Sequence, residues 1–514
     1  MPASTVGASK KQYANSVAVA VHRDSLFSML ERPDLLVDLF FVLHWTLAVV
    51  FALRVIMQRN AVGVTMAWLI LIFFVPVGGS VLYFILGEIH LGKKRTRQAE
   101  MLIQPFKHWI NERQQRFQLN WSKRGESAEV LARHAYAATN LPTMPGNELE
   151  LLDNCQGTLQ RIIEDIRVAR DHIHMEFYIW HPGGLADEVM ETLIAAAERG
   201  DSCRVLLDSI GSHEFLQGSL CKKARAAGVE IAVALPVRWL RSLYRRQDLR
   251  MHRKIVVIDG ELAYTGSLNL VDSRYFKSEA QVGAWVDSMV RIQGPVVEAL
   301  ALVFLADWSI ETGMSLDQIK KEDRLQELDP TGEAYVQVVP SGPGFFNQSS
   351  YQSILTAIYL AKRELIFTTP YYVPDEAVQI ALISAVMRGV AVTLIVPKQV
   401  DSRLVHHASR AYFQELLEGG VQVALFNGGL LHSKTVTIDG ETGLIGSVNL
   451  DQRSLWLNQE VTLFVYDQEF TTSLRQLQKH YIEKSELLRL AEWRTRPYSE
   501  RLLENTLRLT GPLL

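Results

Sequence analysis

Two segments of the chain carry the same chemically capable residues at the same spacing. Residues 252–269 read HRKIVVIDGELAYTGSLN, and residues 432–449 read HSKTVTIDGETGLIGSVN. Each segment holds a His, then a Lys, an Asp, and finally Gly-Ser-x-Asn. A lone His is usually structural, but a complete set of residue types repeated at identical spacing in one chain is not a chance match. The repeat therefore predicts one chemical centre built from two copies.

The spacing within each motif suits chemistry at phosphorus. Side chains two positions apart in a strand lie on the same face, so His252 and Lys254 point the same way, as do His432 and Lys434. A neutral imidazole is a nucleophile, and an ammonium group holds a phosphate oxygen as a compact charge. Displacement at a phosphodiester also needs a proton donor for the departing alkoxide. We therefore expect the two imidazoles to face one phosphate, with their pKa values pushed apart.

The other motif residues have supporting roles. Asp259 and Asp439 precede a Gly at a turn, where they fix geometry rather than accept a proton. Four hydrogen-bonding residues arrive on the returning chain, where they can orient the imidazole or the phosphate: Ser267, Asn269, Ser447 and Asn449. Lysines and amide donors can neutralise the developing charge, so the pattern requires no metal and no other cofactor.

The elements around each motif are repeated as well. A helix near residues 159–169 and a strand at 172–180 have counterparts at 354–361 and 364–372. Both copies continue with a helix closed by Gly, a strand of buried type, another helix and another strand. Strands that alternate with helices at this spacing predict crossover units, largely parallel sheets and an α/β fold.

Two apolar stretches precede the duplicated region. Residues 39–57 and 61–86 are each long enough for a membrane-spanning helix, which needs about 20 apolar residues, and a three-residue connector joins them. They predict a two-helix transmembrane hairpin within residues 34–90. Basic residues flank both of its ends, which places the ends and the soluble region on the cytoplasmic side. Pro76, with the glycines after it, marks the alternative of a kinked or re-entrant second segment.

The flanking segments have simpler interpretations. Residues 1–33 form a polar extension rather than a secretory signal, residues 91–140 a basic helical connector, and residues 496–514 a C-terminal tail. His44, inside the first apolar stretch, is interpreted as a structural group that hydrogen-bonds within the hairpin.

Composition limits the class of partner. Charged residues make up 21% and hydrophobic residues 48%, which suits a globular enzyme with a modest membrane portion. A net charge of -3 argues against a nucleic-acid-binding protein, because such proteins usually carry a basic surface. The cysteines lack CxxC spacing, so neither a zinc site nor a disulfide framework is predicted.

The doubled motif resembles the HKD motif of the phospholipase D superfamily, and the likeness extends over about residues 140–490. It implies two pseudo-symmetric αβα sandwich halves, residues 141–325 and 326–495, and a ping-pong reaction without cofactors. The likeness implies that one of His252 and His432 forms a covalent phosphatidyl-histidine, and that the other protonates the leaving alcohol and deprotonates the incoming one. By analogy alone, His252 is favoured as the nucleophile, and the sequence leaves the choice open. The likeness also assigns phosphate binding and support of the site to the remaining residues: Lys254, Asn269, Lys434 and Asn449 for phosphate, and Asp259 and Asp439 for support.

The apolar N-terminal region, the total length and residues 269–276 and 431–440 are similar to those of bacterial cardiolipin synthases. That family condenses two phosphatidylglycerols into cardiolipin and glycerol. The likeness implies anionic lipid partners, no nucleic acid, and a multi-pass place in the cytoplasmic (inner) membrane. Whether copies of the chain form a homo-oligomer stays open. Glu460 matches the family's acidic residue after the second Gly-Ser-x-Asn, whereas only Gln281 or Glu279 stands opposite it, so the two halves are expected to differ in role.

A basic insertion distinguishes the first copy. Residues 238–250 stand where the second copy has only residues 427–431. Trp239 and Tyr244 share one helical face with arginines beside it, as in an interfacial helix attracted to anionic lipid. A solvated loop is equally compatible. In the first interpretation, four arginines bind lipid headgroups: Arg238, Arg241, Arg245 and Arg246.

Other activities share parts of this pattern. An endonuclease of the same superfamily would need no membrane segment and would carry a broad basic surface. A phospholipase D-type hydrolase differs only in using water to resolve the intermediate, and another phosphatidyltransferase would use a different alcohol. A non-enzymatic membrane scaffold is disfavoured because both motifs are complete.

Overall fold

The computed structural model describes residues 33–58, 62–87, 95, 97, 108–113, 116–117, 119–236, 249–276, 283–315, 318, 327–343, 346 and 348–511. These residues fall into two compact units. One is formed by the N-terminal apolar helices, and the other holds both copies of the motif.

The N-terminal unit contains three helices. α2 (Pro33–Met57) covers the first predicted span, but the second apolar stretch is divided into α3 (Val62–Phe74) and α4 (Gly78–Leu86). The division falls at Pro76, which has no backbone N–H to donate, and Val77 adopts a left-handed φ of 59°. The prediction of one continuous second helix is therefore wrong, and the broken alternative is the one that the structure contains.

α4 folds back along α3. Gly79 lies so close to α3 that a Cβ atom at this position would stand 2.1 Å from the Leu71 carbonyl oxygen. The rings of Trp68 and Tyr83 are 5.3 Å apart, whereas a straight helix would separate these two positions by about 22 Å. α3 and α4 are therefore an antiparallel pair, and only Gly allows their backbones to approach so closely.

His44 of α2 stabilises the turn between α3 and α4. Its Nδ1 accepts a hydrogen bond from the Val77 amide at 3.2 Å. In hydrocarbon an unpaired amide costs on the order of several kcal/mol. His44 is buried in α2 because it supplies the acceptor that the Val77 amide needs. The prediction that His44 hydrogen-bonds within the N-terminal region is confirmed.

The path of the three helices has a consequence for membrane topology. Among the described helices only α2 has a segment long and apolar enough to cross a bilayer, Val37–Met57. The turn after α3 reaches only as far as His44, and Tyr83 on the returning helix lies 5.7 Å from the Phe51 ring. α4 therefore runs back toward the end at which α2 finishes.

We expect α2 to cross the membrane and the α3–α4 pair to enter and leave on one face, so that the two flanks of the apolar region emerge on opposite faces. Single cysteines at Asp34, Gln58 and Lys93, in a chain without its native cysteines, test this with a membrane-impermeant maleimide on intact and permeabilised cells. Gln58→Cys and Lys93→Cys should label alike, and Asp34→Cys should label from the other side. Matching accessibility of the cysteines at 34 and 93 would instead show two full spans.

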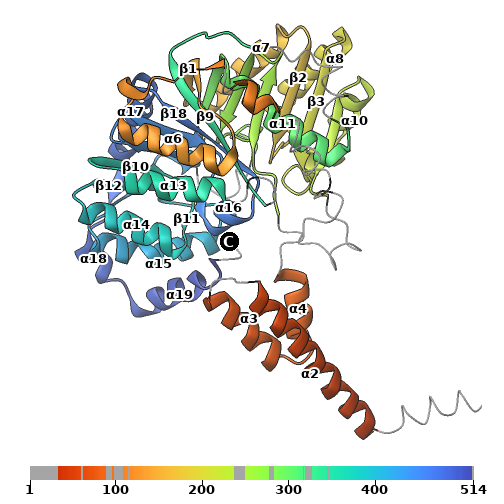
Figure 1. Ribbon diagram of the computed structural model, residues 1–514, viewed down its shortest axis with the longest axis vertical. Coiled ribbons are helices and arrows are strands. Elements are labelled where there is room, and N and C mark those ends of the chain that lie inside the picture. The colour runs from red at the N-terminus through yellow and green to blue at the C-terminus, as the bar shows by residue number, and fades with distance from the viewer. Residues whose placement is uncertain are drawn as a thin grey trace, which may run out of the picture. The chain divides into compact units, whose positions relative to one another are not determined.

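The second unit is built on one mixed sheet (Figure 1). Its strands lie in the order β19-β13-β12-β10-β15-β16-β18-β9-β1-β8-β6-β5-β2-β3-β4. The first half supplies β1 (Met144–Leu152), β2 (His172–Phe177), β3 (Ser202–Asp208), β4 (Glu230–Ala234), β5 (Lys254–Ile258), β6 (Leu262–Gly266) and β8 (Met289–Gln293). The second supplies β9 (Ala334–Ser341), β10 (Glu364–Thr368), β12 (Ala391–Pro397), β13 (Gln422–Phe426), β15 (Thr435–Ile438), β16 (Thr442–Gly446), β18 (Glu460–Tyr466) and β19 (Ser485–Leu487).

The two halves repeat the same strand order and join at their edges. The order β4-β3-β2-β5-β6-β8-β1 corresponds to β13-β12-β10-β15-β16-β18-β9, and β1 pairs with β9 in antiparallel fashion. Within this sheet, as far as the structure describes it, the parallel pairings are those of β2-β3-β4 and β10-β12-β13. The prediction of largely parallel sheets is therefore wrong beyond these crossover units, because the motif strands return through tight hairpins at Asp259-Gly260 and Asp439-Gly440.

Helices cover both faces of the sheet. In the first half these are α7 (Cys155–Arg167), α8 (Leu185–Arg199), α9 (His213–Gln217), α10 (Ser219–Ala226) and α11 (Val296–Thr312). The alternation of β2 shows how both faces are covered. Ile173, Met175 and Phe177 pack with α7 and α8, whereas the ring of His174 stacks on Phe304 of α11 at 4.6 Å. The expected αβα sandwich is confirmed in this half.

The second half has the same layers, formed by α13 (Ser349–Leu360), α14 (Glu376–Met387), α15 (Arg403–Glu418), α16 (Gln452–Trp456) and α17 (Gln468–Glu483). Leu365 and Phe367 of β10 join the core under α13, α14 and α15. Ile366 between them joins Leu477 and Tyr481 of α17. One strand thus buries alternate side chains against two helical layers.

Segments that flank the halves complete the unit. η1 (Trp121–Lys123) and α6 (Glu126–Thr139) precede β1, and α6 packs on α13. After β19 come α18 (Leu490–Arg494) and α19 (Tyr498–Arg508). Arg410 of α15 donates to Glu504 at 2.8 Å and to Glu500 at 2.9 Å, so most of the predicted C-terminal tail is a packed helix.

Candidate active site

Each motif histidine is positioned by a strand of the opposite half. The His252 amide donates to the Gln459 carbonyl at 2.8 Å, just before β18. In the mirrored arrangement, the short strand β14 (Leu430–Leu431) pairs with β7 (Trp285–Val286), and the His432 amide donates to the Val286 carbonyl at 2.8 Å. The backbone alone therefore fixes both histidines to the junction of the halves.

The imidazoles are oriented by carboxylates that come from the opposite half. His252 Nδ1 lies 2.8 Å from Glu460 Oε2, and His432 Nδ1 lies 2.6 Å from Asp287 Oδ1. A carboxylate at Nδ1 favours the tautomer that carries the proton there, so the Nε2 lone pair is free for another partner. The same carboxylate stabilises the imidazolium when a proton or phosphorus binds at Nε2.

The motif serines lie behind these carboxylates. Ser447 Oγ donates to Glu460 Oε2 at 2.6 Å, and Ser267 Oγ donates to Asp287 Oδ1 at 2.7 Å. Both serines are fully buried. They orient the imidazoles through the carboxylates rather than by direct contact, a role that their position in the motif did not indicate.

Asp287 is the acidic partner that spacing failed to identify. Ser447 and Glu460 are separated by 13 positions, but Ser267 and Asp287 are separated by 20, because a longer loop intervenes in the first half. The expectation that only Gln281 or Glu279 stands opposite Glu460 is therefore wrong, and both of those residues lie outside the described part of the chain. The position of the next strand would have identified the acid. Asp287 comes just before β8, which pairs with β6, and Glu460 begins β18, which pairs with β16.

The middle residue of each H-x-K motif also braces the opposite half. Arg253 Nε donates to the Glu460 carbonyl at 3.0 Å, and its guanidinium forms a buried ion pair with Asp307. In the second motif, Ser433 Oγ lies 2.6 Å from the Ser288 hydroxyl, next to Asp287. Sequence reasoning treated both middle positions as unspecified.

Burial controls the charge of the imidazoles. Removal from water lowers the pKa of His252 and of His432 to about 4, against the opposing effect of the partner carboxylates. Burial acts to raise the pKa of Asp287, but His432 and Lys434 stabilise its ionised form and the pKa falls to about 2. These shifts favour two neutral imidazoles beside ionised acids near neutral pH.

The motif lysines lie under the histidine backbone. Lys254 Nζ donates to the His252 carbonyl at 2.7 Å, and Lys434 Nζ makes the same bond to the His432 carbonyl. Burial lowers the pKa of Lys254 to about 8 and that of Lys434 to about 7, against the attraction of nearby carboxylates. Neither ammonium group lines the cavity, so direct binding of phosphate by these lysines stays a prediction.

Asp259 and Asp439 lie at the opposite ends of their strands from the histidines. Each occupies a left-handed turn, with φ of 54° and 55°. The Asp259 carboxylate accepts the amides of Arg170, Asp171 and His172, which anchors the β5–β6 hairpin to the start of β2. Asp439 makes the equivalent bonds to residues 362–364. These acids support the fold around the site and do not line the cavity.

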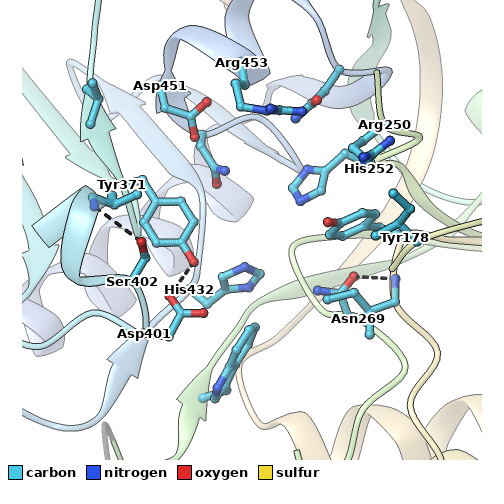
Figure 2. Close-up of a pocket in the computed structure, with 17 residues that line it drawn as sticks. Tyr178, Arg250, His252, Asn269, Tyr371, Asp401, Ser402, His432, Asp451 and Arg453 are labelled. Atoms are coloured by element: carbon cyan, nitrogen blue, oxygen red, sulfur yellow. Dashed lines mark hydrogen bonds between the residues drawn. The ribbon is translucent and has the colours of Figure 1, made fainter. Parts of the chain in front are cut away.

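A cavity of about 460 Å³ brings His252, His432, Asn269 and Asn449 together. Figure 2 shows both imidazoles directed into this shared space from the two halves. Several lining residues were not anticipated from sequence: Tyr178, Ile179, Ile210, Arg250, Trp285, Tyr371, Val373, Asp401, Ser402, Val405, Asp451, Arg453 and Asn458. The four arginines of the basic insertion, Arg238, Arg241, Arg245 and Arg246, lie outside the described residues.

The arrangement is suited to two-step displacement at one phosphorus atom. The histidines of two His–carboxylate pairs line the same cavity. Either imidazole can attack phosphorus while the other donates a proton to the leaving group and accepts one from the incoming group. Within the described part of the chain, no three His, Cys, Asp or Glu side chains gather as metal ligands would.

Comparison with known proteins agrees with this geometry. A family model described as "Cardiolipin synthase, PLD-like domain" matches residues 162–308 and 354–482, and one described as "Phospholipase_D-nuclease N-terminal" matches residues 46–88. Cardiolipin synthase A of Serratia proteamaculans (strain 568) is 43% identical over 471 residues, which cover 92% of this chain and 97% of that protein. The protein of the same name from Erwinia tasmaniensis has the same identity and coverage.

A solved structure supports the fold. The crystal structure of phosphatidylserine synthase from Haemophilus influenzae Rd KW20 matches with a TM-score of 0.56 at 16% identity, over 75% of this chain and 100% of that one. At this identity the likeness concerns the fold alone. The sequence matches cover both motif halves and the apolar N-terminal region, and on their strength the chain belongs to the family of cardiolipin synthases with phospholipase D-like domains.

Proposed function

We propose that this protein is a cardiolipin synthase, which transfers the phosphatidyl group of one phosphatidylglycerol to a second and releases glycerol. The observation that carries the proposal is the pair of reciprocal His–carboxylate contacts that open on one cavity. The likeness to cardiolipin synthase A over 92% of the chain supports the choice of substrate.

In the first half-reaction, His252 Nε2 attacks the phosphorus of a bound phosphatidylglycerol. A P–N bond forms, the P–O bond to glycerol breaks, and His432 donates a proton to the departing alkoxide. Burial favours the neutral form of His432, but a phosphodiester anion nearby favours the protonated imidazole. Binding of substrate thus creates the acid that the step requires. Glu460 then stabilises the cationic phosphatidyl-histidine.

In the second half-reaction, a hydroxyl of another phosphatidylglycerol attacks the same phosphorus. His432 accepts the hydroxyl proton, the P–N bond to His252 breaks, and cardiolipin forms. Asn269 and Asn449 line the cavity, and their side-chain amides are proposed to donate to the phosphate. If water takes the place of the second lipid, the product is phosphatidic acid.

The setting proposed for this chemistry is the cytoplasmic (inner) membrane, with the motif halves on the cytoplasmic face. The N-terminal apolar helix and the membrane lipids acted on by the family support a membrane location. The basic residues of the 238–250 insertion are proposed to attract anionic headgroups.

Purified protein incubated with vesicles of phosphatidylglycerol as the only lipid should form cardiolipin and an equal amount of free glycerol. Both products can be quantified, the lipid by mass spectrometry and the glycerol enzymatically. Phosphatidic acid as the sole lipid product would instead identify a phospholipase D-type hydrolase.

The carboxylates should be needed for the rate rather than for binding. Glu460→Gln and Asp287→Asn remove the charge that holds the tautomer and stabilises the imidazolium, so we expect kcat to fall on the order of 10³-fold with a small change in KM. Glu469→Gln, at an exposed position of α17, is the matched control. Retention of near-normal kcat by both buried variants would refute the role given to the reciprocal pairs.

The two histidines can be assigned by a donor whose leaving group needs no proton, such as phosphatidyl-p-nitrophenol. His432→Ala should release about one equivalent of p-nitrophenol per protein in a burst and then stall, because attack remains possible and deprotonation of the acceptor does not. His252→Ala should release none. The reverse pattern would make His432 the nucleophile.

A further inference from the structure

The two walls of the active-site cavity differ in chemistry. The first half contributes Ile179, which follows β2, and Ile210, which follows β3. From the corresponding loops the second half contributes Tyr371, which follows β10, and Asp401, which follows β12. Figure 2 shows Tyr371 and Asp401 on the His432 side of the cavity and Tyr178 beside His252. The site is thus pseudo-symmetric in its histidines but not in its walls.

The motif end of the second half adds to this asymmetry. Asp451 follows Asn449-Leu450, whereas Val271 follows Asn269-Leu270. Asp451 lines the cavity and is 6% exposed, and one of its oxygens accepts the Ser454 amide at 2.8 Å. The second half therefore lines the cavity with two carboxylates, whereas no Asp or Glu among the described residues of the first half lines it.

The second wall presents hydrogen-bond acceptors, two of which have no donor in the described part of the chain. Tyr371 donates its hydroxyl to Asp401 at 2.8 Å. The Oδ1 atoms of Asn449 and Asn458 have no hydrogen-bond partner within the described part of the chain, although these side chains are only 5% and 8% exposed. A buried acceptor without a partner is costly, so the wall is built to receive donors from a ligand.

The chemistry of the ligand follows from the charges. A phosphate oxygen placed against Asp401 or Asp451 would be repelled, so these acids face another part of the substrate. Arg453 lines the same wall, which disfavours a cationic group such as an ammonium. A neutral group with several hydroxyls satisfies the carboxylates and amide oxygens without opposing the arginine.

We propose that Asp401, Asp451 and the side-chain oxygens of Asn449 and Asn458 form a polyol subsite that holds the glycerol headgroup of phosphatidylglycerol by its free hydroxyls. The inference rests on the proposed function and deepens it. Glycerol would leave from this subsite in the first half-reaction, and the headgroup of the second lipid would occupy it in the next. Asp401 lies on the His432 side of the cavity, next to the histidine that is proposed to exchange a proton with the alcohol.

Competition between two free alcohols tests the subsite. Phosphatidylglycerol vesicles are incubated with equal concentrations of deuterated glycerol and 1-propanol, which has the same carbon number but one hydroxyl. Mass spectrometry gives the ratio of deuterated phosphatidylglycerol to phosphatidylpropanol. Wild-type protein should favour glycerol. Asp401→Asn and Asp451→Asn should each lower the ratio about 10-fold or more, because a hydrogen bond to a charged acceptor is lost.

The ratio is internal to each reaction, so partial unfolding of a variant does not change it. Glu198→Gln, at an exposed position of α8, should leave the ratio at the wild-type value. Unchanged ratios in both aspartate variants, with active wild-type protein, would overturn the subsite alone. The same competition can be run with ethanolamine in place of glycerol. If the aspartate variants lowered transfer to ethanolamine more than transfer to glycerol, the subsite would instead be a site for an ammonium group. Wild-type protein that transferred to propanol and water but not to glycerol would refute the proposed function as well.

Discussion

The proposed active site depends on one reciprocal constraint, the hydrogen bond that each motif imidazole makes to a carboxylate of the opposite half. Burial disfavours charge on the imidazoles and lowers the pKa of both to about 4. The carboxylates oppose that effect and fix the tautomer, so each ring is neutral yet prepared to become cationic once phosphorus or a proton arrives. Backbone pairing, the buried serines and Arg253 all serve to keep these two contacts in place.

Sequence reasoning was strongest where identity and spacing were repeated. The doubled motif placed His252 and His432 correctly in one centre, because residues that recur in two copies must occupy equivalent places. The spacing did not identify Asp287, because the loop before this acid is longer in the first half than the corresponding loop in the second. The strand next to the acid occupies the same place in both halves. The prediction of strand direction was wrong beyond the crossover units. The Asp-Gly turns make tight hairpins, so the strands on either side of each turn pair in antiparallel fashion.

The asymmetric part of the site could not have been read from the motif at all. Tyr371 and Asp401 belong to loops that become neighbours of the histidines only when the sheet forms. The division of α3 from α4 was visible as Pro76, but its partner His44 lies on another helix and required the folded structure. In both cases the missing information is tertiary contact between segments far apart in the chain.

The pairing of β1 with β9, interrupted by a register shift between Met144 and Asn147, joins the sheets of the two halves at the level of the backbone. A hinge motion that separated the two histidines would have to break this pairing. It would also have to break the β7–β14 pairing and the hydrogen bond from the His252 amide to the Gln459 carbonyl. We therefore expect the lipids and the released alcohol to reach and leave the histidines through the cavity that both halves line. In the proposed ping-pong cycle, the departing alcohol therefore has to leave the cavity before the next lipid can occupy it.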